Sequence, residues 1–196
     1  MAIEHNSTYH VSTEEIIDIC KRQGRAFEAS VDASGDDEIA GGEALRTVFV
    51  TGDNPVIFFS RKLSYSGDGI NAYLYRDPVY TGGTESIDIN NPNDINPQAN
   101  QSTFLSGTNV TLDGVKSRAT VYVYGNTSVQ GRGEVLEVID DPQIIPPNST
   151  VLFIIENRSS TSSQDVSSIV QWCEPERIPG LSIVDGSFVR YSGKLL

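Results

Sequence analysis

Short runs in which apolar and polar residues alternate are the feature of this sequence that most constrains its fold. In 120–124, valine alternates with threonine and tyrosine, so an extended chain would carry valine on one face and the polar groups on the other. Sequences rich in Gly, Pro, Asn and Asp separate the runs, as at 51–55, 66–69 and 146–149. We therefore expect strands at 26–31, 45–50, 56–65, 70–75, 117–124, 134–139, 151–157 and 166–173.

A series of strands without intervening helices predicts an all-β chain, folded as an antiparallel β-sandwich. Among such sandwiches, the jelly roll is the arrangement that we expect. A chain of 196 residues suits one core. We assign 25–174 to the sandwich domain, 1–24 to an N-terminal arm with a short helix, and 175–196 to an extended C-terminal arm. Within that last arm, 188–191 can pair as a short strand.

The segment 13–23 departs from the period of two and predicts the helix. Ser12 or Thr13 can cap it, two glutamates follow in its first turn, and Gly24 ends it. Its apolar stripe consists of Ile16, Ile17, Ile19 and Cys20. A helix of about three turns is not stable alone, so it must pack on the sandwich or on another subunit.

The stretch 78–112 is polar and rich in asparagine, and we expect a long loop there. Loops of that length in a compact domain usually carry function or are covered by a partner.

The chain carries 14 basic and 26 acidic residues, for a net charge of −12. Such a surface repels DNA, RNA and anionic membranes, so we expect neither nucleic acid nor a membrane as a partner. No apolar run is long enough to span a bilayer, and Met1–His5 lacks the features of a secretory signal. We expect the protein in the cytoplasm where it is made, or in a particle assembled there.

The residue types that carry catalysis are sparse, and we expect no catalytic, metal or cofactor site. The two histidines, His5 and His10, both lie near the N-terminus, and no nucleophile elbow or phosphate-binding loop is present. The acidic segment 32–43 loosely resembles a calcium loop, but Asp37 stands where such a loop needs glycine. We therefore expect an acidic turn at this position.

Cys20 and Cys173 lie far apart in the sequence and in no metal-binding spacing. Two buried free thiols are one interpretation. A disulfide is the other, if the N-terminal segment lies over the last long strand.

Tyr73, Tyr75 and Tyr80 near Asp77 form the only cluster of aromatic residues beside an acid that suits carbohydrate. A glycan-binding or glycan-cleaving site is one interpretation. Because tyrosines at alternate positions usually line one face of a sheet, packing on that face is the other.

Five segments together resemble a known family in their order and spacing. They are Gln23–Ser30, Thr51–Val56, Ala72–Pro78, the glycines 82–83 with the following Asn90–Asn91, and the Pro-Asn-Ser-Thr turn with its strand at 147–157. Over about residues 15–173 the chain resembles small structural proteins encoded among the head genes of tailed bacteriophages, of the capsid decoration or cement type. It departs from them at Asp53–Asn54, where many relatives have a basic turn, and in 174–196, which extends past the usual end.

The resemblance implies a non-enzymatic virion protein, made in the host cytoplasm, that binds the outer surface of a capsid and stabilises contacts between shell subunits. Its implied partners are the major capsid protein and further copies of itself, with a trimer favoured over a dimer. The alternative is a tail, baseplate or receptor-binding β module that contacts host surface glycans. Apolar side chains in the two arms are the expected partner-binding residues: Ile16, Ile17, Ile19, Ile183, Phe188 and Tyr191.

Overall fold

The computed structural model describes residues 8–10, 12–110, 115–116, 121–124, 133–175, 181–184 and 187–191, with side chains over 12–107 and 143–175. Within these ranges the chain is almost entirely β, with one α-helix, α1 (Thr13–Arg22), and a 3-10 turn at Gly35–Asp37. The strands are β1 (Thr8–His10), β2 (Ala26–Ala33), β3 (Ala44–Val50), β4 (Val56–Tyr65), β5 (Gly69–Arg76), β6 (Tyr80–Ser86), β7 (Ile89–Asn90), β8 (Thr103–Val110), β9 (Val115–Lys116), β10 (Val121–Tyr124), β11 (Gly133–Ile145), β12 (Thr150–Asn157), β13 (Val166–Cys173), β14 (Leu181–Val184) and β15 (Ser187–Tyr191).

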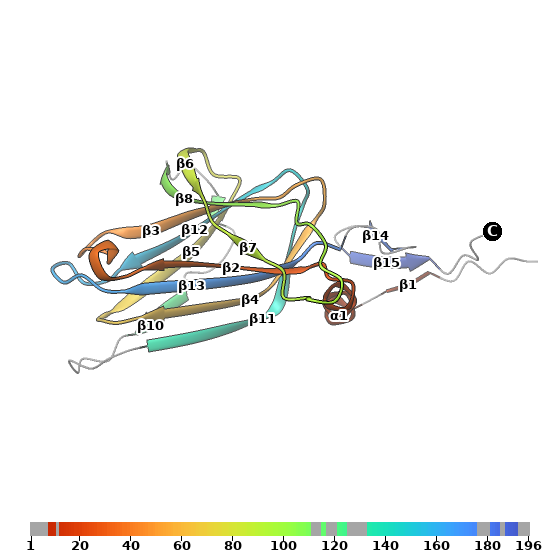
Figure 1. Ribbon diagram of the computed structural model, residues 1–196, viewed down its shortest axis with the longest axis horizontal. Coiled ribbons are helices and arrows are strands. Elements are labelled where there is room, and N and C mark those ends of the chain that lie inside the picture. Colours follow the sequence, from red (N-terminus) through yellow and green to blue (C-terminus); the bar gives the residue numbers. More distant parts are fainter. Residues whose placement is uncertain are drawn as a thin grey trace, which may run out of the picture.

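Two antiparallel sheets form the body of the molecule (Figure 1). The five-stranded sheet has the order β11-β4-β13-β2-β7, and the seven-stranded sheet has the order β10-β5-β12-β3-β8-β6, with β9 added beside β5.

The pairing pattern of these strands defines the topology. β2 pairs with β13, β3 with β12, β4 with β11, and β5 with β10, all antiparallel. The first half of the body and the second half are thus the two arms of one long hairpin. Successive strands of each arm fall in alternate sheets, so the hairpin is rolled into a sandwich. This is the jelly roll, a fold of viral capsid, lectin and cupin domains, and the predicted fold class is confirmed.

Aromatic side chains fill the space between the sheets. Phe49 on β3 meets Phe58 on β4 edge to face at 4.9 Å between ring centroids, and meets Trp172 on β13 at 5.0 Å. Phe104 and Phe153 extend the same cluster. Edge-to-face pairs add to the stabilisation that comes from burying the rings, so this layer fixes how the sheets face each other.

The outward face of the seven-stranded sheet carries a second apolar cluster. Val48, Leu152 and Ile154 are buried there, and Tyr73, Tyr75 and Tyr80 pack against them half-buried. β12 is therefore buried on both faces, which explains its continuous run of hydrophobic residues. The tyrosines line a sheet face, as the packing interpretation predicts.

The polar stretch 78–112 is not the single long loop that we expected. It contains β6, β7 and β8. β6 and β8 pair with each other and extend the seven-stranded sheet beyond β3, whereas β7 pairs with β2 in the five-stranded sheet. Most side chains of β6 are exposed and glycines interrupt its register, so the strand shows little apolar alternation. Within the described part of this stretch the longest segment outside strands is the loop 91–102, and it lies beside α1 (Figure 1).

The N-terminal helix packs on the sandwich of its own chain. Ser12 caps it, since its Oγ accepts a hydrogen bond from the Glu15 amide at 3.2 Å. Ile16, Ile17 and Cys20 are buried against Ile57 and Cys173. Of the two alternatives, packing on the sandwich is therefore the one observed.

The two terminal segments pair with each other. β1 runs antiparallel to β15, and β15 forms a hairpin with β14, so the three make a separate small sheet beside α1 (Figure 1). The short strand expected at 188–191 is confirmed as part of β15. The expected strands 56–65 and 166–173 are observed with the same bounds, whereas 117–120 lies outside the described residues.

Candidate interaction surface

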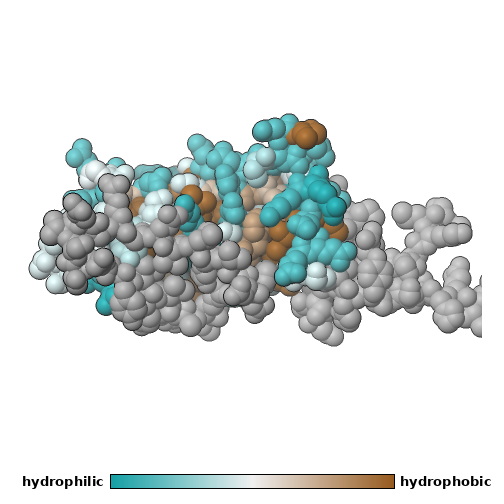
Figure 2. All heavy atoms as spheres, turned by 90° about the horizontal axis from the view of Figure 1, so that it is seen from below, coloured by the Kyte–Doolittle hydropathy of each residue, from teal (hydrophilic) through white to brown (hydrophobic). Residues whose placement is uncertain are grey.

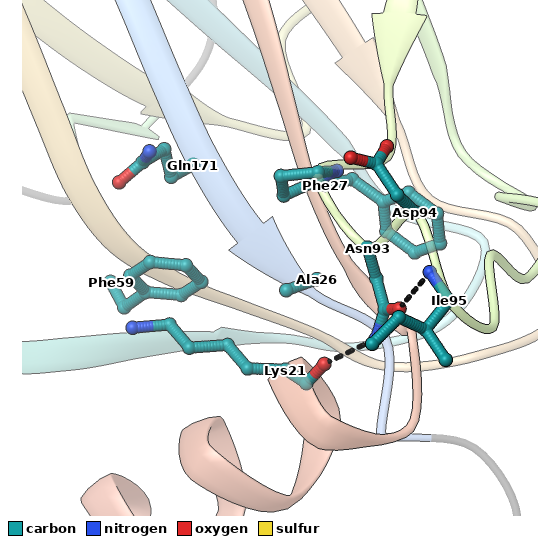
Figure 3. Close-up of a pocket in the computed structure, with 9 residues that line it drawn as sticks. Lys21, Ala26, Phe27, Phe59, Asn93, Asp94, Ile95 and Gln171 are labelled. Atoms are coloured by element: carbon teal, nitrogen blue, oxygen red, sulfur yellow. Dashed lines mark hydrogen bonds between the residues drawn. The ribbon is translucent and has the colours of Figure 1, made fainter.

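A groove of about 530 Å³ lies between α1 and the loop 91–98, over the outer face of β2, β13 and β4 (Figure 3). Its apolar lining comes from Ala26, Phe27, Phe59, Pro92 and Ile95. The polar groups at its border are Lys21, Asn93, Asp94 and Gln171. Seen from below, brown apolar surface lies among teal hydrophilic residues toward this end of the molecule (Figure 2).

Asn91 fixes the base of the 91–98 loop. Its Nδ2 donates hydrogen bonds to the carbonyls of Gly24 at 2.7 Å and Gln98 at 2.9 Å. The Gln98 amide also donates to the Gly24 carbonyl at 3.1 Å. One side-chain amide thus ties both ends of the loop to the chain that follows α1.

Asn93 fixes the tip of the loop. Its Nδ2 donates to the Lys21 carbonyl in the last turn of α1 at 2.9 Å. Its Oδ1 accepts from the amides of Ile95 at 3.0 Å and Asn96 at 2.9 Å, an Asx turn that directs the backbone outward (Figure 3). The Ile95 side chain is consequently held in solvent, 97% exposed.

Gly24 allows the loop to lie close against the end of α1. Its φ is +71°, a conformation that favours glycine, and an added Cβ would lie 1.7 Å from the Asn96 carbonyl oxygen. The close approach is between backbones, so no side-chain movement can relieve it. The placement of the loop therefore depends on a glycine at this position.

Glu174 anchors the far end of the same loop. The carboxylate is buried and accepts four hydrogen bonds, from the Gln101 and Ser102 amides, the Ser102 hydroxyl and the Trp172 indole, at 2.9, 3.2, 2.6 and 3.3 Å. Charge-assisted bonds of this kind are strong where water is excluded. The loop is thus pinned at both ends and at its tip.

The electrostatics of the groove are mixed. Lys21 Nζ lies 5.0 Å from the centroid of the Phe59 ring, within range of a cation–π contact, and Asp94 supplies an acid at the opposite border. None of the described residues that line the groove is a histidine, cysteine, serine or threonine. The arrangement can bind an apolar group beside a cation, and it offers no nucleophile paired with a base.

Among the described residues, no three His, Cys, Asp or Glu side chains are grouped so that they could hold a metal ion. No described helix has the length and apolar character needed to cross a membrane.

The residues predicted to bind partners fall in two places. Ile16 and Ile17 are 0% and 8% exposed and contact their own chain, so in this fold they form core rather than free surface, while Ile19 is half-buried. Ile183 and Phe188 are opposite each other in the β14–β15 hairpin, and Tyr191 is opposite Thr8. The side chains of Ile183, Phe188 and Tyr191 lie outside the described residues, and their partner role stays a prediction.

Ile95 and Phe59 were not predicted from the sequence as residues of a site. The signal for Ile95 was available, because it is the one large apolar residue between Asn90 and Gln101. Phe59 could not be recognised, because it occurs in a continuous apolar run in which the outward position is visible only in the sheet.

No family model and no curated protein matches this chain. A solved virus-like particle of the extra small virus of the giant freshwater prawn Macrobrachium rosenbergii is 11% identical over 88% of this chain and 82% of that chain, with a TM-score of 0.28. A T=1 particle derived from infectious bursal virus is 11% identical over 96% of this chain and 44% of that chain, with a TM-score of 0.16. Scores this low carry no argument, and the fold assignment rests on the strand pairing of the chain itself.

Proposed function

We propose that this chain is a non-enzymatic structural protein of a bacteriophage virion, which binds the outer surface of the capsid and stabilises contacts between shell subunits. The observation that carries the proposal is the pinned loop that holds Ile95 in solvent beside an apolar groove. A folded chain gains nothing for its own stability by exposing that side chain. Rigid apolar anchors of this kind are what dominate the energy of protein interfaces.

The fold supports the proposal. A jelly roll presents loops at both ends of a stiff sandwich, and it is used widely by proteins of viral particles. In this chain the loop 91–102 connects β7 to β8, and its tip at Asn93 contacts the last turn of α1. The insertion therefore places the candidate surface at one end of the sandwich without disturbing the core.

The net charge supports the outer rather than the inner face of a shell. DNA fills the inside of a phage head, so a protein of charge −12 would be repelled there. On the outside it meets solvent and protein only. Contacts with a shell would then come from burial of Ile95 and the groove, which requires no basic surface.

The terminal sheet supports self-association. β1 and β14 are the outer strands of this three-stranded sheet, so each has one edge that is not paired within it. Edges of this kind can pair with another chain. We propose that they contribute to a homo-oligomer, with a trimer favoured. Removal of 175–196 should then leave the sandwich folded and weaken association, as measured by light scattering coupled to gel filtration.

Electron cryomicroscopy of virions that contain the protein tests the proposed location. We expect its density on the outer capsid, with the α1 end facing the shell. Density in the tail or baseplate instead would overturn the capsid assignment and favour the alternative receptor-binding role.

The alternative, contact with host glycans, has one observation in its favour. The rings of Tyr73 and Tyr75 are half-buried, with their centroids 6.2 Å apart on the outer sheet face. Asp77, the acid nearest to them in sequence, accepts a hydrogen bond from the Thr150 amide at 3.1 Å, so it clamps β12. A glycan array with the intact protein tests this role: specific binding that is lost in Tyr73→Ala supports it, and absence of binding removes it.

A further inference from the structure

Two thiols from opposite ends of the chain lie together under α1. Cys20 lies on α1 and Cys173 ends β13, and both are 0% exposed. They share one apolar cluster with Ile16, Ile17 and Ile57. Both are free thiols in this structure.

The backbone brings the two segments together. The Arg25 amide donates to the Cys20 carbonyl at 2.8 Å, and the Glu174 amide donates to the Arg25 carbonyl at 3.0 Å. Cys173 is opposite Ala26 in the β2–β13 ladder. Residues on both sides of each cysteine are thus hydrogen-bonded into one framework, which restricts how far the two sulfurs can separate.

The shared cluster makes the two thiols neighbours in apolar surroundings. Burial, then the hydrogen bond with Cys20, raise the pKa of Cys173 well above its usual value. Neighbouring thiols held on one hydrogen-bonded framework are the arrangement that a disulfide requires.

We propose that Cys20 and Cys173 are an oxidisable pair, which a small-molecule disulfide converts into an intramolecular bridge that fastens α1 to β13. One cysteine thiolate attacks the sulfur–sulfur bond of the oxidant, forms a mixed disulfide and releases one small thiolate. The sulfur of the other cysteine then attacks the mixed disulfide and releases the second. Two electrons pass from the protein to the oxidant, and the two protons end on the released thiols. This inference is independent of the proposed role in a virion.

The bridge would act on the candidate surface. Cys20 precedes Lys21, whose carbonyl accepts the hydrogen bond from Asn93 and whose ammonium lies over Phe59. Fastening α1 therefore fixes one wall of the groove. It also closes a loop that contains the whole sandwich, which restricts the unfolded chain and stabilises the folded one.

Burial makes the reaction slow near neutral pH, because the oxidant reaches the enclosed thiols only when α1 moves away from the sandwich, and because burial also raises the pKa of Cys173. Exchange needs a thiolate, and Cys173 remains protonated to a higher pH than an ordinary thiol. The rate of bridge formation should therefore increase as the pH is raised toward that elevated pKa.

The test is to incubate the full chain with oxidised glutathione and to count the free thiols after denaturation. We expect both thiols to be lost together, a mass lower by two hydrogen atoms, and migration as a single chain on a gel without reductant. The oxidised protein should unfold at a higher temperature than the same preparation after treatment with dithiothreitol. Cys20→Ala and Cys173→Ala should each lack that reductant-sensitive shift.

Three outcomes would overturn the proposal: two thiols that persist through prolonged oxidation at raised pH, a stable glutathione adduct, or chains linked to one another. Since either alanine variant can loosen α1, the comparison of oxidised and reduced wild-type protein decides the question independently of them.

Discussion

Two polar loops lie at opposite ends of the sandwich (Figure 1). Both are held by hydrogen bonds from side-chain amides to the backbone, but they serve different roles. The loop 157–165 begins with the last residue of β12 and leads to β13, and the loop 91–102 lies beside α1. Each is rich in Asn, Gln or Ser, and each is held by side-chain amides that bond to backbone groups. In sequence they look alike.

The loop 157–165 directs its amides inward. Asn157 Nδ2 donates to the carbonyls of Ile39, Ala40 and Ser162, at 2.9, 3.2 and 2.8 Å. Its Oδ1 accepts from the Ser159 amide and from Gln164 Nε2, both at 2.9 Å. Asn157 and Gln164 are themselves buried, so this loop closes one end of the core.

The loop 91–102 uses Asn91 and Asn93 in the same way but exposes its one large apolar side chain. Hydrogen bonds of the same kind therefore complete the fold at one end and hold an exposed apolar side chain at the other. We expect the stability of the fold to depend on the loop 157–165 and association with a partner to depend on the loop 91–102. Substitutions in each loop test this difference.

The largest effect is expected for Asn157→Ala. Three carbonyls, of which only that of Ile39 is in a buried hydrogen bond, and two donors, the Ser159 amide and Gln164 Nε2, each lose a bond, and water can replace only part of the loss. We expect the free energy of unfolding to fall by roughly 3–5 kcal/mol. Urea denaturation measures it, with the exposed Ser160→Ala as the control. A loss of stability no larger than that of Ser160→Ala would show that the hydrogen bonds of Asn157 do not support the core.

A smaller loss of stability is expected for Glu174→Gln. The amide retains one acceptor oxygen but turns an NH₂ group toward donors, so we expect a fall of about 2 kcal/mol. Trp172 is the single tryptophan and donates to this carboxylate, so its fluorescence should change with the variant. The exposed Glu43→Gln is the control. Unchanged emission together with full stability would contradict the anchoring role.

Gly24→Ala tests the close approach of the loop to α1. We expect a loss of about 1–2 kcal/mol, from the positive φ and from displacement of the loop. Gly42→Ala is a matched control, because its φ is +76° and an added Cβ meets nothing within 4 Å. The difference between the two variants measures the clash alone. Equal losses in urea denaturation would mean that Asn96 moves away without cost.

Ile95→Ser should change stability least, within about 0.5 kcal/mol, because the side chain is already in solvent. Under the proposed function it should lower the amount of protein that cosediments with capsids. Val79→Ser is the control, since Val79 is the other exposed large hydrophobic residue among those described. Equal retention of both variants on particles would exclude Ile95 as an anchor.

The sequence was sufficient for the body of the fold, because the information there is local. Alternation located β4 and β13, and the capping serine located α1. β6 was missed because it is an edge strand that faces solvent and lacks a clear period. β8 was missed because its apolar residues Phe104 and Leu105 are adjacent rather than alternating, and polar residues and a glycine follow them. The candidate surface was missed because Lys21, Phe59 and Ile95 come together only when α1, β4 and the 91–98 loop are placed in three dimensions.

The rolled hairpin also determines the order in which hydrogen bonds break when a mechanical force is applied to the two chain ends. β2 and β13 are antiparallel neighbours, and Ala26 at the start of one is opposite Cys173 at the end of the other. A force that pulls the two chain ends apart therefore first opens the β1–β15 pair and then acts across this ladder, whose hydrogen bonds break one pair at a time. Cys20 and Cys173 lie at the open end of the β2–β13 ladder, where a covalent link would take the load before these two strands separate.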